Sequence, residues 1–163
     1  MWKVKKSKIH ANGVFATENI QKGKKIIEYI GEKVTRAEGD RRSERRLKRH
    51  LNSKKIGSVY IFELNKKYDI DGSPFYNKAR YINHSCSPNC EVEIIRGHIW
   101  IISIKNIKKG QELSYDYGYE FDKDDYMDHV CKCGARNCIR FIISSDDWPK
   151  YKKSLKTKNS YKK

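Results

Sequence analysis

Short apolar runs alternate with polar turns along most of the chain, and this pattern favours a fold rich in short β-strands. Arg96 and Gly97 separate two such runs, which predicts a β-hairpin. Further turns are expected at residues 21–23, 71–74 and 108–110. The runs expected to form strands are residues 13–16, 25–30, 59–64, 68–70, 91–95, 98–104 and 113–119.

One segment has a helical pattern instead. Residues 36–51 contain neither Gly nor Pro after Gly39 and are rich in Arg, Glu and Leu, which are good helix formers. We therefore expect one helix there. Beyond Trp148 and Pro149 the sequence is rich in Lys and shows no pattern, so we expect a basic tail over residues 150–163, flexible and outside the folded part.

The composition suits a single compact domain. The 163 residues are enough for one core, and the aromatic content of 12% supplies packing although the mean hydropathy is −0.88. No apolar run approaches the ~20 residues needed to span a bilayer. The basic residues that follow Met1 and Trp2 precede no apolar stretch, so they do not form a secretory signal. We expect an intracellular protein with no membrane partner.

The net charge of +16 implies attraction to an acidic partner. Residues 36–49 hold seven bases against three acids, and residues 150–163 hold seven lysines and no acid. Such runs form either solvated surfaces and frayed tails or contacts with nucleic acid or a nucleosome. The sequence alone leaves both readings open.

The five cysteines lie in the second half of the chain. An odd number without a secretory signal argues against a disulfide framework. Cys131, Cys133 and Cys138 form a tight cluster with a turn at Gly134, one ligand short of a tetrahedral zinc site. The fourth ligand would be Cys86 or Cys90. Free or redox-active thiols are the alternative.

Four segments together resemble the SET-domain lysine methyltransferases. Residues 80–90 read Arg-Tyr-Ile-Asn-His-Ser-Cys-Ser-Pro-Asn-Cys and depart from the family signature only at Tyr81, where the family has Phe. Residues 110–117 read Gly-Gln-Glu-Leu-Ser-Tyr-Asp-Tyr, the second signature. The Cys-x-Cys-x4-Cys cluster matches the post-SET zinc segment, and residues 13–16 and 28–32 match the N-terminal motif. The motifs occur in the family's order over residues 6–142.

The resemblance implies a mostly β fold of short curved sheets around a knot-like core, where the Asn-His-Ser-Cys segment crosses the segment that carries Tyr117. It implies a SET domain over residues 3–121 with a variable helical insertion at 36–58, and a post-SET zinc segment at 129–143. Taken alone, Asn83 and His84 would suit an ordinary turn. The alternating Tyr115, Tyr117 and Tyr119 would suit one face of a strand.

The implied reaction is methyl transfer from S-adenosylmethionine to a protein lysine. A lysine ammonium has a pKa of about 10.4 and must lose its proton before it attacks, which burial and a nearby sulfonium both favour. Tyr117 matches the catalytic tyrosine, Tyr60 a channel tyrosine, and Tyr115 the position whose Tyr accompanies monomethylation. With no separate base in the family's motifs, bulk solvent takes the proton.

The resemblance also implies the binding residues. In the loop that approaches the cofactor, Ala11 stands where the family has Gly, and Gly tolerates close backbone approach better. Cys86 would be the fourth zinc ligand and Cys90 a spare thiol. The full cofactor set is His10, Ala11, Asn12, Gly13, Tyr60, Arg80, Asn83, His84, Tyr117 and Phe141, with Phe141 placed against the adenine; the metal set is Cys86, Cys131, Cys133 and Cys138.

The expected partners are a protein substrate with a target lysine, histone-like or another basic protein, and nucleic acid or a nucleosome at the basic segments. The implied location is the nucleus or chromosome in a eukaryote and the cytoplasm in a bacterium. The alternative is a non-catalytic, basic, zinc-containing module that binds nucleic acid or chromatin. Ala11 and the +16 charge favour the alternative, whereas Asn83, His84 and Tyr117 favour the enzyme.

Overall fold

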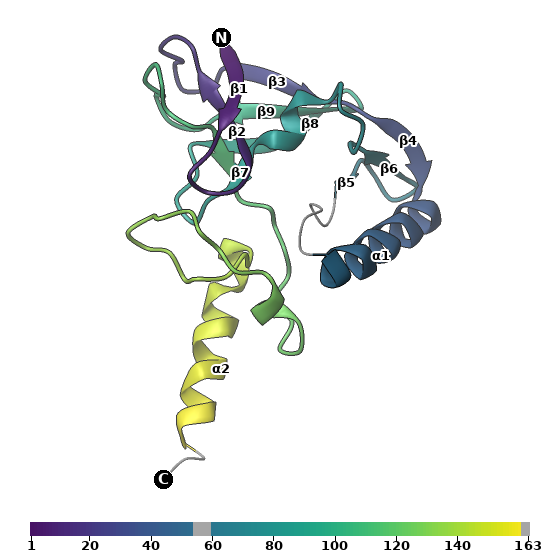
Figure 1. Ribbon diagram of the computed structural model, residues 1–163, viewed down its shortest axis with the longest axis vertical. Helices are drawn as coiled ribbons and strands as arrows, with labels where there is room; N and C mark the ends of the chain where they lie inside the picture. The colour runs from purple at the N-terminus through teal and green to yellow at the C-terminus, as the bar shows by residue number, and fades with distance from the viewer. Residues whose placement is uncertain (54–59, 161–163) are drawn as a thin grey trace.

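The computed structural model of the chain describes residues 1–53 and 60–160. Three predictions extend outside this part: the end of the helical insertion (54–58), the first residue of the strand expected at 59–64, and the last residues of the basic tail (161–163). Within it the architecture is mostly β, as the sequence predicts (Figure 1).

Four small sheets make up the β structure of the described residues. Three are antiparallel: β1 (Trp2–Lys6) with β2 (Asn12–Ala16); the order β3 (Lys25–Tyr29), β9 (His98–Ser103), β8 (Cys90–Ile95); and the order β4 (Glu32–Thr35), β6 (Tyr68–Asp71), β5 (Ile61–Glu63). The fourth pairs β7 (Asn83–His84) with β10 (Ser114–Tyr115) in parallel. This parallel pair places the two signature segments side by side, so residues 31 positions apart meet at the centre of the fold.

The predicted hairpin is confirmed. Cys90–Ile95 pairs with His98–Ser103, and Arg96 and Gly97 both have positive φ, at 51° and 80°, as a two-residue turn of the hairpin type requires. The strand predicted at 113–119 is wrong beyond its first residues, because β10 ends at Tyr115. Sequence reasoning also missed β1 and β4, whose apolar positions are few.

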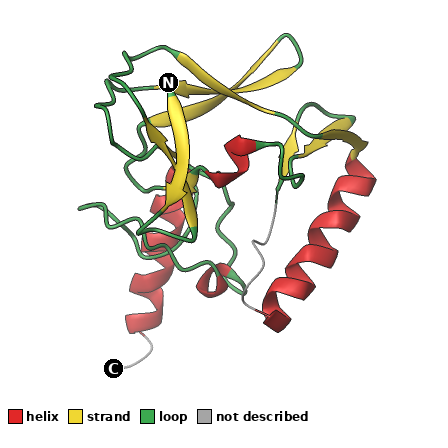
Figure 2. Cartoon of the chain, turned by 45° about the horizontal axis from the view of Figure 1, so that its top comes forward, coloured by secondary structure: helices red, strands yellow, loops and turns green. Residues whose placement is uncertain are grey.

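Two α-helices lie in the described part (Figure 2). α1 (Arg36–Ser53) agrees with the prediction, whereas α2 (Trp148–Ser160) corrects the expectation of an unpatterned tail. Pro149 suits the first turn of a helix, and Asp147 just before it pairs with Lys150. Neither helix in the described part is both long enough and apolar enough to cross a membrane. Short 3₁₀ turns lie at Lys78–Tyr81, Tyr126–Asp128 and Ser145–Asp147.

The buried apolar side chains form two separate cores. The main core gathers fifteen buried residues of the described part from five strands (β2, β3, β8, β9 and β10) and the segments between them, with Val14, Ile82, Ile101 and Leu113 almost inaccessible. Burying each such side chain contributes roughly 1.5–3 kcal/mol. The second core is smaller and aromatic: Tyr126, Ile143 and Tyr151 are buried, and half-buried neighbours pack around them, namely Phe121, Ile139, Phe141 and Trp148.

Candidate active site and metal centre

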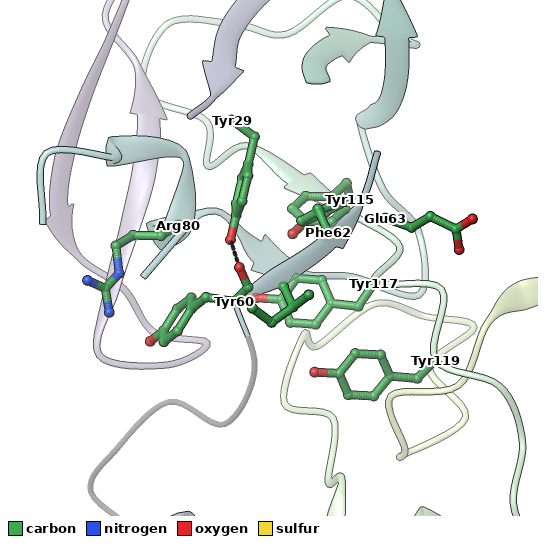
Figure 3. Close-up of a pocket in the computed structure, with 9 residues that line it drawn as sticks. Tyr29, Tyr60, Phe62, Glu63, Arg80, Tyr115, Tyr117 and Tyr119 are labelled. Carbon is green, nitrogen blue, oxygen red and sulfur yellow. Dashed lines mark hydrogen bonds between the residues drawn. The ribbon is translucent and has the colours of Figure 1, made fainter. Parts of the chain in front are cut away.

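A pocket of about 260 Å³ opens where the central sheets meet, and tyrosines dominate its wall (Figure 3). The lining side chains come from the end of β3, from β5 and the residue before it, from the 3₁₀ turn at 78–81, and from β10 and the segment after it. They are Tyr29, Tyr60, Ile61, Phe62, Glu63, Arg80, Tyr115, Tyr117 and Tyr119. A narrow aromatic pocket of this kind fits an aliphatic stem with a polar tip.

Tyr117 is held in place at three points. Its hydroxyl donates to the Ile82 carbonyl at 3.0 Å, and its backbone N–H donates to Nδ1 of His84 at 3.2 Å. Its ring lies between those of Tyr115 and Tyr119, with centroids 5.0 and 5.9 Å away. The Tyr117 amide bonds to a side chain instead of a neighbouring strand, so β10 ends before this residue. All three alternating tyrosines still line the same pocket.

Three of the pocket tyrosines, Tyr29, Tyr115 and Tyr117, are held in the neutral phenol form. Burial, and to a smaller extent the other tyrosines, raises the pKa of Tyr115 and Tyr117 well above that of a free phenol, and burial does the same for Tyr29. A phenolate base is therefore excluded at physiological pH. The wall offers hydroxyls and apolar ring faces, and its one carboxylate, that of Glu63, points away from the tyrosines and pairs with Arg36 at 2.7 Å (Figure 3). Such a wall disfavours the charged form of an amine that enters.

Arg80 marks one end of the pocket with an unsatisfied cation (Figure 3). Its guanidinium lies over the ring of Tyr60 at 4.2 Å, and Nη1 donates to the Ser73 carbonyl. Its Nε is buried and has no hydrogen-bond acceptor among the residues described. A half-buried guanidinium whose buried Nε lacks an acceptor fits a carboxylate ligand, such as the one that the methionine part of S-adenosylmethionine carries.

Asn83 ties the N-terminal loop to the centre of the fold. Its Nδ2 donates to the carbonyls of Asn12 at 3.0 Å and His10 at 3.4 Å, and to Oε1 of Glu112 at 2.7 Å. Glu112 also accepts from the Ser7 hydroxyl at 2.8 Å. Sequence reasoning assigned no role to Glu112, although it lies within the second signature.

Backbone geometry explains two loop positions. A Cβ on Gly13 would lie 2.2 Å from Oε1 of Glu112, so only glycine fits without moving that side chain. Ala11 has a φ of 41°, in the left-handed region that favours glycine. The alanine that replaces the family's glycine therefore keeps the conformation of a glycine position, at a cost of about 1 kcal/mol.

His84 lies between the pocket and the cysteines. It is buried, which lowers its pKa below the usual range against the opposing pull of the Asp116 carboxylate, 3.7 Å from Nδ1. Nδ1 accepts the Tyr117 amide, so the proton of the neutral ring is on Nε2. Nε2 lies 3.7 Å from Sγ of Cys86.

Four cysteine sulfurs, those of Cys86, Cys131, Cys133 and Cys138, lie within 4.8 Å of one another. Sγ of Cys86 is 3.8 Å from that of Cys131 and 3.9 Å from that of Cys138, too far for a disulfide of ~2.05 Å. A tetrahedron of thiolates at about 2.3 Å from zinc has edges of about 3.8 Å, so the cluster fits that metal.

Backbone amides support thiolate at this cluster. The amides of Cys86 and Ala135 both donate to Sγ of Cys133 at 3.5 Å, and these bonds, acting against burial, lower the Cys133 pKa to about 7. Cys90 stays apart, as predicted: it is fully buried and its thiol donates to Oδ1 of Asn89. The predicted cluster thus forms with Cys86 and not Cys90 as its fourth member.

The structure brings most predicted site residues together. Tyr60, Arg80, Tyr115 and Tyr117 line the pocket, and the loop from His10 to Gly13 joins it through Asn83. Phe141 does not line the pocket: it lies in the second core, 4.9 Å from the ring of Tyr126. Sequence reasoning gave no site role to Tyr29, although it lies within the N-terminal motif at 28–32, and it missed Phe62, whose only sequence signal was a place in an apolar run.

The family model described as SET domain matches residues 11–118. Among curated proteins, the chain is 38% identical over 141 residues to "Histone-lysine N-methyltransferase, H3 lysine-4 specific" of Saccharomyces cerevisiae, covering 84% of this chain and 13% of the relative. It is 36% identical to "Histone-lysine N-methyltransferase 2D" of Homo sapiens, with 84% and 2% covered. It is 33% identical to "Histone-lysine N-methyltransferase trithorax" of Drosophila melanogaster, with 84% and 4% covered.

The chain thus spans only a small part of each of these much longer relatives, but they cover most of its own length. The family match includes the parallel pair of β7 and β10, the residues of the tyrosine pocket except Tyr119, and the loop at Ala11. On this evidence the chain belongs to the SET-domain family.

Proposed function

We propose that this chain is a protein-lysine N-methyltransferase that uses S-adenosylmethionine. The observation that carries the proposal is the neutral tyrosine pocket, in which Tyr117 is fixed at its hydroxyl and its amide. The pocket has the width and polarity for a lysine side chain, and Arg80 offers an unpaired donor to a carboxylate at its end. The printed activity of the relatives agrees with this chemistry.

The pocket residues act mainly by positioning. S-adenosylmethionine, when bound, supplies an electrophilic methyl group on a sulfonium. The aromatic wall desolvates the substrate ammonium and so lowers its pKa, after which bulk solvent takes the proton. The Tyr117 hydroxyl, anchored on the Ile82 carbonyl, orients the amine for in-line attack. Alignment of this kind supplies much of the rate of a displacement reaction.

The proposed cofactor site uses the loop from His10 to Gly13, together with Tyr60, Asn83, His84 and Arg80. Asn83 supports the loop by binding two of its carbonyls. Arg80 would bind the carboxylate through the donors that Ser73 leaves free. Contact of Phe141 with the adenine stays a prediction. The Phe141 ring is half-buried and packs against Tyr126, so the adenine would have to bind the part of the ring that this contact leaves exposed.

We further propose one structural zinc held by Cys86, Cys131, Cys133 and Cys138. The metal would join the C-terminal part of the chain to Cys86, which lies two residues after β7 and therefore close to the active site. All four positions are taken by sulfur, which is typical of a structural site and leaves no open position for a substrate.

The proposed substrate is a histone lysine, and the proposed main product is monomethyl-lysine. The relatives' names support a histone, one of them H3 lysine 4. Tyr115 supports the product, because it is buried beside Tyr117 and its hydroxyl takes up room that a methylated amine needs to turn. A histone substrate further implies a chromosomal location, nuclear in a eukaryote, and a nucleosome contact through the basic segments of α1 and α2.

Two measurements test the proposal. The chain is incubated with labelled S-adenosylmethionine and histones, other basic proteins or lysate, and modified lysines are located by mass spectrometry. Calorimetry with S-adenosylmethionine alone is the second. A chain that methylates no protein and releases no heat with the cofactor would instead be the non-catalytic binding module.

A further inference from the structure

The basic run of α1 has less free charge than its sequence suggests. Arg36 pairs with Glu63 at 2.7 Å, and Arg42 pairs with Glu32 and Asp71 at 2.7 and 2.8 Å. Arg41 pairs with Glu38, and Arg46 lies 3.8 Å from Asp71. Acids of the neighbouring sheet thus neutralise much of this run.

Tertiary structure gathers six lysines from two loops 80 residues apart. The loop between β2 and β3 pairs with the loop between β9 and β10 through Ile20 and Ile107, whose backbones exchange two hydrogen bonds of 2.8 Å (Figure 1). Both isoleucines are buried beneath the surface that the loops form. All six lysines on that surface are exposed, and we call them the lysine patch: Lys22, Lys24, Lys25, Lys105, Lys108 and Lys109.

The frame that carries the lysine patch is held by reciprocal bonds. Oδ1 of Asn106 accepts the amide of Lys22, and Oδ1 of Asn19 accepts the amide of Lys109, both at 2.9 Å. The Ser103 hydroxyl accepts the amide of Lys24 at 2.9 Å. Each loop therefore holds the backbone of the other in place. Because this backbone is already ordered, binding a ligand here carries a smaller entropic cost.

No carboxylate of the described residues forms a salt bridge with the patch lysines. The one acid in residues 17–25 and 104–111 is Glu18, and it lies 3.7 Å from the amino group of Met1. The patch thus presents a concentrated positive field. It lies at the end of the molecule away from α2, so the two basic regions are separate surfaces (Figure 1).

The make-up of the patch selects among anionic partners. It includes none of the exposed large apolar side chains of the described part, which a membrane surface would require as anchors. Single-stranded nucleic acid needs open aromatic faces, but the Trp100 ring nearby is covered by the Lys25 ammonium at 4.8 Å. Protein interfaces are depleted in lysine and enriched in arginine and aromatic residues. Point charges without such anchors fit a phosphate backbone.

We infer that the lysine patch binds the phosphate backbone of duplex DNA. The inference deepens the proposed function, because it gives a chromatin enzyme a DNA contact on a surface apart from its pocket. The inference can be tested separately from the proposed function, because DNA binding is measured without methyl transfer.

The test uses fluorescence anisotropy with a short labelled duplex of mixed sequence, titrated over about 50 to 200 mM salt. The patch variant changes Lys22, Lys24, Lys105 and Lys109 to Gln. The control variant makes the same charge change at four scattered exposed lysines, Lys66, Lys67, Lys123 and Lys132. Each lost phosphate contact reduces the slope of log affinity against log salt by about 0.9, so the patch variant should lose about 3 to 4 units of slope. The control should lose about one or less.

Equal slopes for the two variants, or no DNA binding by the native chain, would overturn the inference. So would a patch variant that keeps the native DNA slope while it loses binding to polyglutamate, because the partner would then be an acidic protein. Methylation of a short peptide should stay within about twofold in the patch variant, which also reports that it is folded. A native chain that binds DNA through the patch but methylates no substrate would refute the proposed function alone.

Discussion

The two cores of the molecule differ in what stabilises them. The part of the molecule around the main core, which we call the body, has fifteen buried apolar residues from five strands and the segments between them. The C-terminal segment, residues 119–155, buries Tyr126, Ile143 and Tyr151 among aromatic neighbours. A core of three residues cannot offset the ordering of some 35 residues at roughly 1–2 kcal/mol each for the backbone. The body can fold by burial, whereas the C-terminal segment needs another source of stability.

A metal bound at the four-cysteine cluster, as proposed above, would be that source, because the cluster joins the two regions. Three of its sulfurs belong to the C-terminal segment, and the fourth, Cys86, follows β7 in the body. Structural zinc binding in small domains is worth on the order of 10 kcal/mol at neutral pH. Edge contacts between aromatic rings add only about 0.5–1.5 kcal/mol each. The comparison therefore predicts that a metal bound at this cluster would stabilise the segment more than its own packing does.

The largest expected effect comes from breaking this link at Cys86. In Cys86→Ser, bound zinc should fall from one equivalent per chain to a small fraction, and methyl transfer should fall at least about 100-fold, because the C-terminal segment comes away from the body. Elemental analysis and a peptide assay measure both. Cys90→Ala is the matched control, and it should keep its zinc and most of its activity because Cys90 lies outside the cluster. A Cys86→Ser protein that keeps a full equivalent would contradict the assignment.

The next effect concerns the body alone. Tyr117→Phe should lower the turnover number about 100-fold, equivalent to ~2.7 kcal/mol, because it removes the hydroxyl that is fixed on Ile82. The fold and cofactor affinity should change little, since the ring keeps its neighbours Tyr115 and Tyr119. Tyr68→Phe, outside the pocket, serves as the control. Turnover near the native value in Tyr117→Phe would mean that another group orients the amine.

The third effect separates the first half of α2, which carries Tyr151, from the residues that follow it. The expectation that residues 150–163 form a flexible tail outside the folded part does not hold for Tyr151, which is buried against Tyr126 and Phe141. Deletion from residue 150 should destabilise the C-terminal segment by about 3 kcal/mol or more. Deletion from residue 156 should leave peptide methylation intact and reduce the salt dependence of DNA binding. Equal protease resistance of the two truncated proteins would refute this difference.

Much of the site followed from the sequence because short-range patterns encode it. The spacing of Cys131, Cys133 and Cys138 indicated a metal cluster, and Arg96 and Gly97 indicated the hairpin. The choice of Cys86 over Cys90 came from the family resemblance, because spacing cannot tell which thiol folds toward the cluster.

Features that depend on long-range contacts could not be predicted. Glu112 receives its role from Asn83 and Ser7, and no local pattern records either contact. A count of charges in the sequence likewise does not reveal that Arg36 and Arg42 of α1 pair with acids on neighbouring strands. The helix α2 was missed because its sequence is rich in lysine and has one buried residue, Tyr151, which is too little to give a helical pattern. The partners of Tyr151 lie in the second core.

A smaller effect concerns the product. In Tyr115→Phe, dimethyl and trimethyl lysine should rise about tenfold relative to the native protein, whose main product should be monomethyl-lysine. The hydroxyl of Tyr115 is buried beside Tyr117, and its loss frees about the room of one water, whose displacement is worth at most about 2 kcal/mol. A time course of intact peptide masses measures the distribution. Trimethyl product that dominates early in the native reaction would show that Tyr115 is not the limiting group.

The smallest expected effect tests the loop at Ala11, which the body holds in a left-handed conformation without help from the metal. Ala11→Gly should tighten S-adenosylmethionine binding about threefold by calorimetry, because removal of the Cβ allows closer approach to the backbone. The free energy of unfolding should change by less than about 1 kcal/mol, since relief of the strain opposes the greater chain entropy of glycine. Ala11→Val is the matched opposite, because a β-branched residue at positive φ is far more strained, and it should weaken both properties. If both variants bind the cofactor as the native chain does, the Ala11 side chain faces away from the ligand, and the loop contributes through the carbonyls that Asn83 holds.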